Sequence, residues 1–375
     1  MQATRAERYA LLSAARRIFS AAGKRSGLQY GHDFHRTAKC KFIRYGKDVG
    51  VHKSKAHGSA FFSNLVTCGN VWTCPVCAAK VQERRREEIA QAIDWAYASD
   101  LQPVMVTLTF PHHAWNKVGR LLDQQATALQ RLRAGKPWER FKARHGYHGM
   151  IRSLEITHGA NGWHPHTHEL WFVRRDADPV AMLVDILKRW ESACIRAGLL
   201  DAQNQAQLEA FRAHAVDVKG NCSASDYLAK QDDSKHWGAD REIAKASTKA
   251  GRAKGSHPFG LLAKAADGDT RSARLYLAYS IAMKGRRQLY WSRGLKDAVG
   301  LFDLTDEAIA EESRDAADLL GQITLDDWQT VRDAGARAQV LDAAERGGWP
   351  AVEALIDRLT LAEISRLEAL LYPSG

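Results

Sequence analysis

Residues 153–173 read SLEITHGANGWHPHTHELWFV, and this stretch decides the fold that we expect. Its apolar spacing predicts a strand, a turn over residues 159–162, and a second strand over residues 163–173. His164, His166 and His168 are two residues apart on the second strand, so their imidazoles point to one face. The sequence therefore predicts a β-hairpin that carries a row of three histidines.

The histidine row has the chemistry of a metal site. Imidazole is the commonest protein ligand for divalent metals, and neighbouring rings on one rigid strand can share an ion. Glu155, on the partner strand, could add a carboxylate oxygen. The alternative is a row of solvated or internally hydrogen-bonded histidines.

A cysteine group precedes the hairpin. The CPVC knuckle at residues 74–77 lets two thiolates reach one tetrahedral ion. The expected ligands are Cys40, Cys68, Cys74 and Cys77. His52 and His57 are alternatives to Cys40, and unligated buried cysteines are the alternative to a metal. Four protein ligands leave no open position, so we expect a structural Zn²⁺.

Length and composition indicate two or three domains in a cytoplasmic protein. No apolar run in the 375 residues approaches the roughly 20 residues that span a bilayer. Residues 1–23 have the pattern of a charged amphipathic helix, not of a secretory signal. Four of the six cysteines lie within residues 40–77, which suits a metal site in a reducing compartment better than disulfides. We expect no membrane segment.

The net charge of +11 hides an asymmetry. Residues 302–375 contain 16 acidic and 6 basic side chains, which leaves 48 basic and 27 acidic side chains, a net charge of +21, in residues 1–301. A segment with this excess of basic residues favours a polyanionic partner, and nucleic acid is the obvious one. The acidic segment has helix-start signals at Thr305 and Thr324 and predicts an all-helical module.

Several basic residues are candidates for phosphate contacts. They lie on the helix after the cysteine knuckle and in residues 231–300, where aromatic rings could stack on bases. The candidates are Arg84, Arg85, Lys245, Lys249, Arg252, Arg286 and Arg287. A charged, solvated face is the alternative.

A tyrosine and a lysine have the chemistry of a nucleophile and its charge partner. Residues 225–230 (SDYLAK) read as a helix, on which Tyr227 and Lys230 share a face. A phenol that attacks a phosphodiester must lose its proton, and a nearby cation stabilises the developing charge. The pattern alone is weak, because chance matches are common; Tyr227 lies 61 residues after His166, a distance that gains weight only from the resemblance described next.

Four segments, in this order, resemble the HUH endonucleases in the form seen in rolling-circle replication initiators of small plasmids. They are the CPVC knuckle with its arginine-rich helix, the strand PVMVTLTFP at residues 103–111, GWHPHTHEL at residues 162–170, and the helix with Tyr227. Residues 279–295 also resemble the segment that closes the nuclease domain of that family, so the resemblance spans residues 68–295. Ser223 stands where some relatives carry a glutamate that activates water.

The resemblance implies an α+β fold with a central, mostly antiparallel sheet, the histidine strand in its middle and helices on its flanks. We expect an N-terminal helix and zinc-binding module over residues 1–98 and the HUH nuclease domain over residues 99–300. An acidic helical C-terminal module covers residues 301–375. Within the nuclease domain, residues 211–219 (FRAHAVDVK) read as a strand.

The resemblance also implies a site- and strand-specific endonuclease that initiates rolling-circle replication at a plasmid double-strand origin, on a single-stranded nick site. His166, His168 and a third ligand then hold Mg²⁺ or Mn²⁺; we prefer Glu155 to His164, because hard cations favour carboxylate oxygen. Tyr227 attacks the scissile phosphate and leaves a 5′-phosphotyrosine and a priming 3′-hydroxyl, and its neighbour Lys230 stabilises charge.

Two other functions stay open at this point. A single-tyrosine HUH transposase shares the motif order, and a zinc-dependent DNA-binding regulator would use the histidines only structurally. Host replication proteins and a second copy of the chain are further partners that the sequence leaves open.

Overall fold

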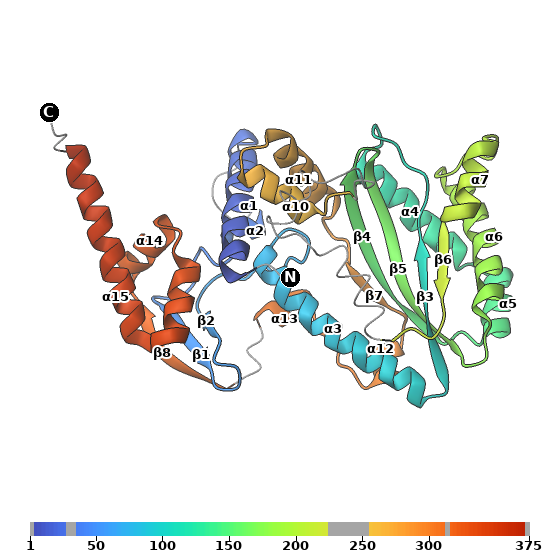
Figure 1. The fold of residues 1–375 in the computed structure, drawn as a ribbon, viewed down its shortest axis with the longest axis horizontal. Coiled ribbons are helices and arrows are strands. Elements are labelled where there is room, and N and C mark those ends of the chain that lie inside the picture. Colours follow the sequence, from blue (N-terminus) through green and yellow to red (C-terminus); the bar gives the residue numbers. More distant parts are fainter. Residues whose placement is uncertain (1–3, 28–34, 224–254, 312–315, 372–375) are drawn as a thin grey trace, which may run out of the picture. The chain divides into compact units, whose positions relative to one another are not determined.

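The computed structural model describes residues 4–27, 35–223, 255–311 and 316–371. It divides into two compact units (Figure 1). The histidine unit comprises Gln82–Leu304, and the cysteine unit joins Ala3–Val81 to Thr305–Gly375. This division differs from the three expected ranges, because the segments on either side of the histidine unit fold together. Among the described residues, no helix combines the length and apolar composition that crossing a membrane requires.

The histidine unit is built on a five-stranded antiparallel sheet in the order β6-β3-β5-β4-β7. Its strands are β3 (Leu101–Leu108), β4 (Gly149–Gly159), β5 (Gly162–Arg174), β6 (Val216–Lys219) and β7 (Leu289–Trp291). The histidine strand β5 lies in the middle, between β3 and β4 (Figure 1). The predicted α+β class and the central place of the histidine strand are both confirmed.

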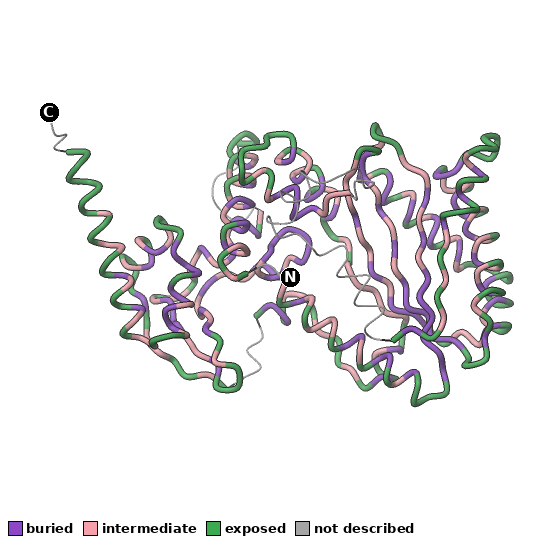
Figure 2. The backbone as a smooth tube through the Cα atoms, in the orientation of Figure 1, coloured by how far each residue is buried: buried purple, intermediate pink, exposed green. Residues whose placement is uncertain are grey.

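Strands β4 and β5 form the predicted hairpin. Gly159 and Gly162 pair with each other across a two-residue turn. Gly162 has φ +85°, a left-handed conformation that glycine adopts without steric cost. The first half of β5 alternates between buried and half-buried residues, whereas residues 169–173 are all buried (Figure 2). The half-buried positions are the three histidines, so their face is only partly covered.

Helices pack on both faces of the five-stranded sheet. On the histidine face, Ile89 and Ile93 of α3 (Pro75–Ala98) and Leu295 of α12 (Leu295–Val299) share a core with Leu170 and Phe172 of β5. On the opposite face, Trp171 of β5 packs edge-on against rings of α5 (Gly135–His145). The other helices among the described residues of this unit are α4 (Val118–Leu132), α6 (Pro179–Ala197), α7 (Gln205–His214), α10 (Pro258–Ala266) and α11 (Thr270–Ala282).

One expected strand is partly a helix. Residues 211–219 are predicted to be extended, but α7 continues to His214 and only Val216–Lys219 forms β6. The side chain of Asn204 accepts a hydrogen bond from the N–H of Gln207 at 3.0 Å and caps this helix. Leu208 and Phe211, three residues apart, bury one helical face, so the cap and this spacing outweigh the strand pattern.

The cysteine unit contains a second antiparallel sheet, in the order β2-β1-β8. Its strands are β1 (Val49–Ser54), β2 (Ala60–Phe62) and β8 (Ala317–Ile323), and its helices are α1 (Arg5–Arg25), α2 (Arg36–Lys39), α13 (Asp306–Glu311), α14 (Leu325–Asp333) and α15 (Arg337–Leu371). Strand β8 corrects the expectation that the segment after residue 302 is all helical. Pairing with β1 satisfies the backbone groups on one edge of β8, and Ile323 at its end is buried.

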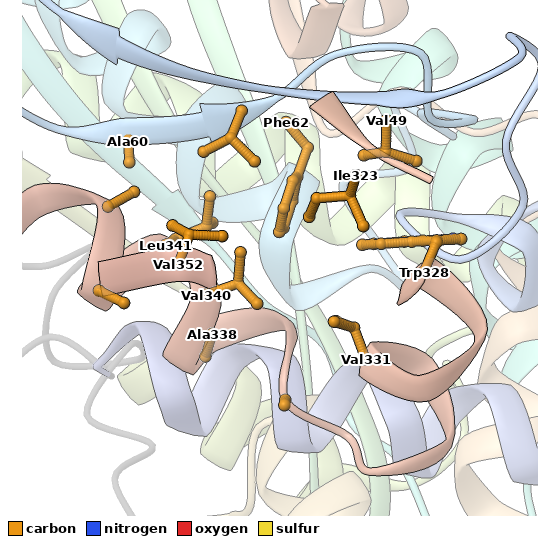
Figure 3. Close-up of a cluster of buried hydrophobic side chains, with 14 of the residues drawn as sticks. Val49, Ala60, Phe62, Ile323, Trp328, Val331, Ala338, Val340, Leu341 and Val352 are labelled. Carbon is orange, nitrogen blue, oxygen red and sulfur yellow. The ribbon is translucent and has the colours of Figure 1, made fainter. Parts of the chain in front are cut away.

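The core of the cysteine unit joins side chains from both of its chain segments (Figure 3). It includes Val49, Phe62, Ile323, Trp328, Val340 and Val352. The indole Nε1 of Trp328 donates to the carbonyl of Phe42 at 3.2 Å, and the buried guanidinium of Arg337 donates to the carbonyl of Lys41 at 2.9 Å. These contacts fix the C-terminal helices against the segment that carries Cys40.

Candidate functional site

The β4–β5 register brings three of the predicted metal ligands together. Glu155 on β4 lies directly opposite His166 on β5, and His168 follows two residues later on the same face. The Nε2 atoms of His166 and His168 lie 3.5 Å and 3.6 Å from Oε2 of Glu155. We call these three residues the Glu-His trio.

Hydrogen bonds at the opposite ring nitrogens orient both imidazoles of the trio. Nδ1 of His166 donates to the carbonyl oxygen of His164 at 3.2 Å. Nδ1 of His168 lies 3.0 Å from the hydroxyl of Thr107, which faces His168 directly in the β3–β5 register. Partners of this kind fix the tautomer and the direction of a metal-binding histidine. Both Nε2 atoms consequently face Glu155.

The geometry of the trio fits a shared divalent cation. Separations of 3.5–3.6 Å are too long for strong hydrogen bonds but suit two ligands of one ion. Oε2 of Glu155 is buried and, among the described residues, makes no hydrogen bond, which is costly unless a cation satisfies it. Burial favours a raised pKa for Glu155, but the two imidazoles outweigh it and the pKa falls below its ordinary value. The site thus offers an ionised carboxylate and two ring nitrogens.

The trio lies where the covered part of the sheet ends. Its side chains retain exposed fractions of 12–13%. Two residues beyond His168, Leu170 enters the apolar core beneath α3 and is fully buried. One side of the trio is therefore dry, whereas its three side chains keep a small solvent-accessible surface.

The ring of the third histidine, His164, stacks on that of His166, but its Nε2 has a hydrogen-bond partner outside the trio. Its Nε2 lies 2.5 Å from the hydroxyl of Thr109, and its ring stacks on that of His112 with centroids 4.6 Å apart. Burial, reinforced by the neighbouring imidazoles, lowers the pKa of His164 to about 3, so the ring is neutral near pH 7. Of the two candidates for the third ligand, Glu155 and not His164 joins His166 and His168.

Thr107 is not among the residues predicted from the sequence. A threonine in an apolar strand is common, and its significance depends on the register of β3 against β5. That register is set by long-range pairing, so the only available signal was the strand PVMVTLTFP itself.

The four predicted cysteines form one buried cluster. The Sγ atom of Cys40 lies 3.5 Å from that of Cys77 and 3.6 Å from that of Cys74, and Cys68 lies 3.8 Å from Cys77. Four sulfurs around one Zn²⁺, with Zn–S bonds of about 2.3 Å, are about 3.8 Å apart. Disulfide sulfurs are much closer, at about 2.05 Å. The spacing thus matches a tetrahedral metal site and not disulfides.

Backbone N–H groups and neighbouring thiols surround the sulfurs. The backbone N–H groups of Cys68, Asn70 and Cys77 each donate to a cluster sulfur at 3.4 Å. Hydrogen bonds from the other three cysteines lower the pKa of Cys77, whereas burial raises the pKa of Cys74. The backbone donors and the close approach of the four sulfurs together fit a bound metal ion.

The two alternative histidines do not join the cysteine cluster. Nε2 of His52 lies 2.9 Å from the hydroxyl of Ser63, and its ring stacks on that of Phe61. Among the described residues, the group around the knuckle contains the four cysteines and neither His52 nor His57.

The predicted phosphate-binding residues have different surroundings. Arg84 and Arg85 form ion pairs with the buried carboxylate of Glu88 on the same helix, and Arg286 pairs with Asp123. Arg287 is exposed. Three of the candidate side chains therefore form ion pairs with carboxylates. Tyr227, Lys230, Lys245, Lys249 and Arg252 lie outside the described residues.

Comparison with known proteins places the chain in a family. The profile of a family described as "Replication protein" matches residues 61–331, a range that contains the trio and three of the four cysteines. "Protein rep" of Streptomyces lividans is 28% identical over 357 residues, covering 77% of this chain and 77% of the relative. A "Neomycin resistance protein" of Streptomyces cyanogenus is 31% identical over 194 residues, covering 40% of this chain and 43% of that one. No solved structure matches significantly. The chain belongs to the replication protein family, the family of plasmid Rep proteins.

Proposed function

We propose that the chain is a site- and strand-specific DNA endonuclease that nicks a plasmid double-strand origin and starts rolling-circle replication. The observation that carries this proposal is the Glu-His trio on the central β4–β5 hairpin of a basic replication protein. Family membership supports the replication role, and the trio supports a metal-assisted reaction on a phosphodiester.

The trio would hold Mg²⁺ or Mn²⁺ through Oε2 of Glu155 and the Nε2 atoms of His166 and His168. When bound there, the cation supplies Lewis-acid polarisation of the scissile phosphate. The ring nitrogens suit Mn²⁺ better than Mg²⁺, which prefers oxygen ligands. We expect Mn²⁺ to support the reaction at lower concentrations than Mg²⁺.

Tyr227 is the proposed nucleophile. Its phenol oxygen loses a proton and forms a bond to the scissile phosphorus, while the bond from phosphorus to the 3′ oxygen breaks. The products are a 5′-phosphotyrosine and a free 3′-hydroxyl that primes synthesis. Lys230, one helical turn away in the expected helix, stabilises the charge that develops.

The chain between Cys222 and Tyr227 is long enough for Tyr227 to reach the trio. The N–H of Cys222 donates to the carbonyl of Pro103 at 2.9 Å, which anchors the chain beside β3. The strand from Pro103 to Thr107, which contacts His168, is about 13 Å long. Five residues span at most about 17 Å, and the tyrosine side chain adds its own length. The chain after Cys222 is therefore long enough to return to the trio.

A covalent-adduct assay tests the proposal. Wild-type protein and Mn²⁺ are incubated with a labelled single strand that contains the plasmid nick site, and denaturing gels should show a protein–DNA adduct. Tyr227→Phe keeps the ring and loses the attacking oxygen, so it should bind the strand and form no adduct. Tyr290→Phe is the control, because Tyr290 packs under Arg152 on the sheet.

Peptide mapping of the adduct gives a second readout. Tyr276 and Tyr279 are fully or almost fully buried, and burial raises the pKa of Tyr279, so neither should carry DNA. An adduct on any tyrosine other than Tyr227 would refute the assignment. Specific binding without any adduct would favour a DNA-binding regulator.

A further inference from the structure

The loop between β3 and α4, residues 109–117, carries an exposed pair of stacked rings. Trp115 has an exposed fraction of 77%. Its indole stacks on the imidazole of His113 with centroids 4.5 Å apart and planes 8° from parallel. Single apolar side chains are common on protein surfaces, so exposure of Trp115 by itself does not indicate a binding site.

The backbone of the loop is held in place. The N–H of His113 donates to the side-chain oxygen of Asn116 at 2.7 Å, and the N–H of Asn116 donates back to the carbonyl of His113 at 2.9 Å. The loop also packs tightly on the β4–β5 turn, because a Cβ at Gly162 would lie 2.9 Å from the Cα of Ala114. A ligand that stacks on Trp115 consequently loses little affinity to ordering of the loop.

A row of rings connects this loop with the trio. His112, next in the chain to His113, stacks on His164 with centroids 4.6 Å apart. His164 stacks in turn on His166, a member of the trio, with centroids 4.8 Å apart. Trp115 therefore lies on the same end of the sheet as the proposed cleavage site.

The charge next to the ring pair suits a polyanion. Lys117, the N-cap of α4, makes no side-chain capping hydrogen bond, and Arg120 follows in the first turn. Both side chains are exposed, and the first turn of α4 contains no acidic residue. Flat rings that stack on bases, beside cations that contact phosphates, are the combination with which proteins bind unpaired nucleic-acid strands.

We infer that Trp115, braced by His113, is a stacking platform for an unpaired base of the DNA strand that the trio holds. The inference rests on the proposed nuclease function and adds a base contact to it. Base pairs in a duplex are already stacked on both sides, so the platform selects single-stranded DNA. It acts on any base, since every base offers a π face.

Two probes of equal charge test the platform. The first is a 20-nucleotide oligo(dT), and the second is a 20-nucleotide strand of the same phosphate backbone in which every base is missing. Wild-type protein should bind oligo(dT) about tenfold or more tightly than the abasic strand, as expected for base–aromatic stacking. Trp115→Ala should lose most of this preference and bind the abasic strand like the wild type.

Two further variants separate the ring from general surface effects. Trp115→Phe keeps an aromatic face and should retain most of the preference for bases. Phe302→Ala removes another aromatic side chain with an exposed fraction of 86% and should behave like the wild type. If Trp115→Ala keeps the full preference, or if Phe302→Ala loses it equally, the platform is refuted.

This outcome is independent of the nuclease assay. Failure of the wild-type protein to form an adduct with Mn²⁺ would refute the proposed function and leave the measured base preference in place. A normal adduct combined with an unchanged base preference in Trp115→Ala would refute the platform alone.

Discussion

The hydroxyl of Thr107 lies 3.0 Å from Nδ1 of His168, and the two residues face each other directly across the β3–β5 register. This contact connects the largely apolar strand β3 with the trio. It indicates that β3 contributes to the site as well as to the sheet, because Thr107 orients the His168 ring whose Nε2 faces Glu155.

Replacing that hydroxyl tests its positioning role. Thr107→Val keeps the shape and the β-branched side chain but removes the hydrogen bond to His168. We expect Mn²⁺ affinity, measured by titration calorimetry, to fall about tenfold, as is typical for partners of metal ligands. Thr109→Val is the matched control, because its hydroxyl contacts His164 outside the trio. Equal affinities in both variants and the wild type would contradict the role of Thr107.

Substitutions at His166 and at His164 should differ sharply in their effect on Mn²⁺ binding. His166→Ala and Glu155→Gln each remove a ligand, so binding of Mn²⁺ and cleavage should both be lost while the circular dichroism spectrum is retained. His164→Ala removes a neutral ring outside the trio and should change Mn²⁺ affinity by no more than about threefold. Loss of metal in His164→Ala, with retention in Glu155→Gln, would reverse the assignment of the third ligand.

The cysteine cluster predicts a tightly held metal. Elemental analysis of the purified protein should find about one zinc per chain, as one four-cysteine site requires. The double variant Cys74→Ser, Cys77→Ser should contain none. Cys194→Ala is the control, since Cys194 is buried in α6 and is not part of the cluster. Zinc retained in the double variant would place the metal elsewhere.

The close approach of β8 to α15 predicts a sensitive glycine. A Cβ at Gly321 would lie 2.1 Å from Cδ2 of Trp349, so Gly321→Ala should lower the free energy of unfolding by about 1–3 kcal/mol. Thermal unfolding measures the loss, and Gly119→Ala, which meets open space on α4, should cause none. Adding Trp349→Ala to Gly321→Ala should cost less than the sum of the two single changes. Strict additivity would mean that the two side chains do not meet.

The local parts of the fold were predictable from the sequence. The period of two in residues 163–173 and the glycines at 159 and 162 identified the β4–β5 hairpin, because alternation and turn chemistry act between near neighbours. The short spacing of the cysteine knuckle likewise brought Cys74 and Cys77 together. The pairing of Glu155 with His166 followed once the hairpin register was given.

The long-range parts were not predictable in the same way. Strand β8 pairs with β1 from the other end of the chain, and its sequence ADLLGQI has no strict alternation. Thr107 and His112 reach the histidine row through contacts that depend on the β3–β5 register and on the loop after β3. Such pairings depend on tertiary packing, which a single sequence does not encode in any local pattern.

The order β2-β1-β8 also has a consequence for synthesis on the ribosome. About 250 residues separate β2 from β8, and at roughly 5–20 residues per second the ribosome needs about 12–50 s to make them. During that interval β1 has one unpaired edge, and α14 and α15 do not yet cover the apolar face of the β1–β2 sheet. The histidine unit, in contrast, is complete by residue 304. Nascent chains should therefore acquire the histidine unit first, and premature termination after that point should yield products whose cysteine unit is a target for chaperones and proteases.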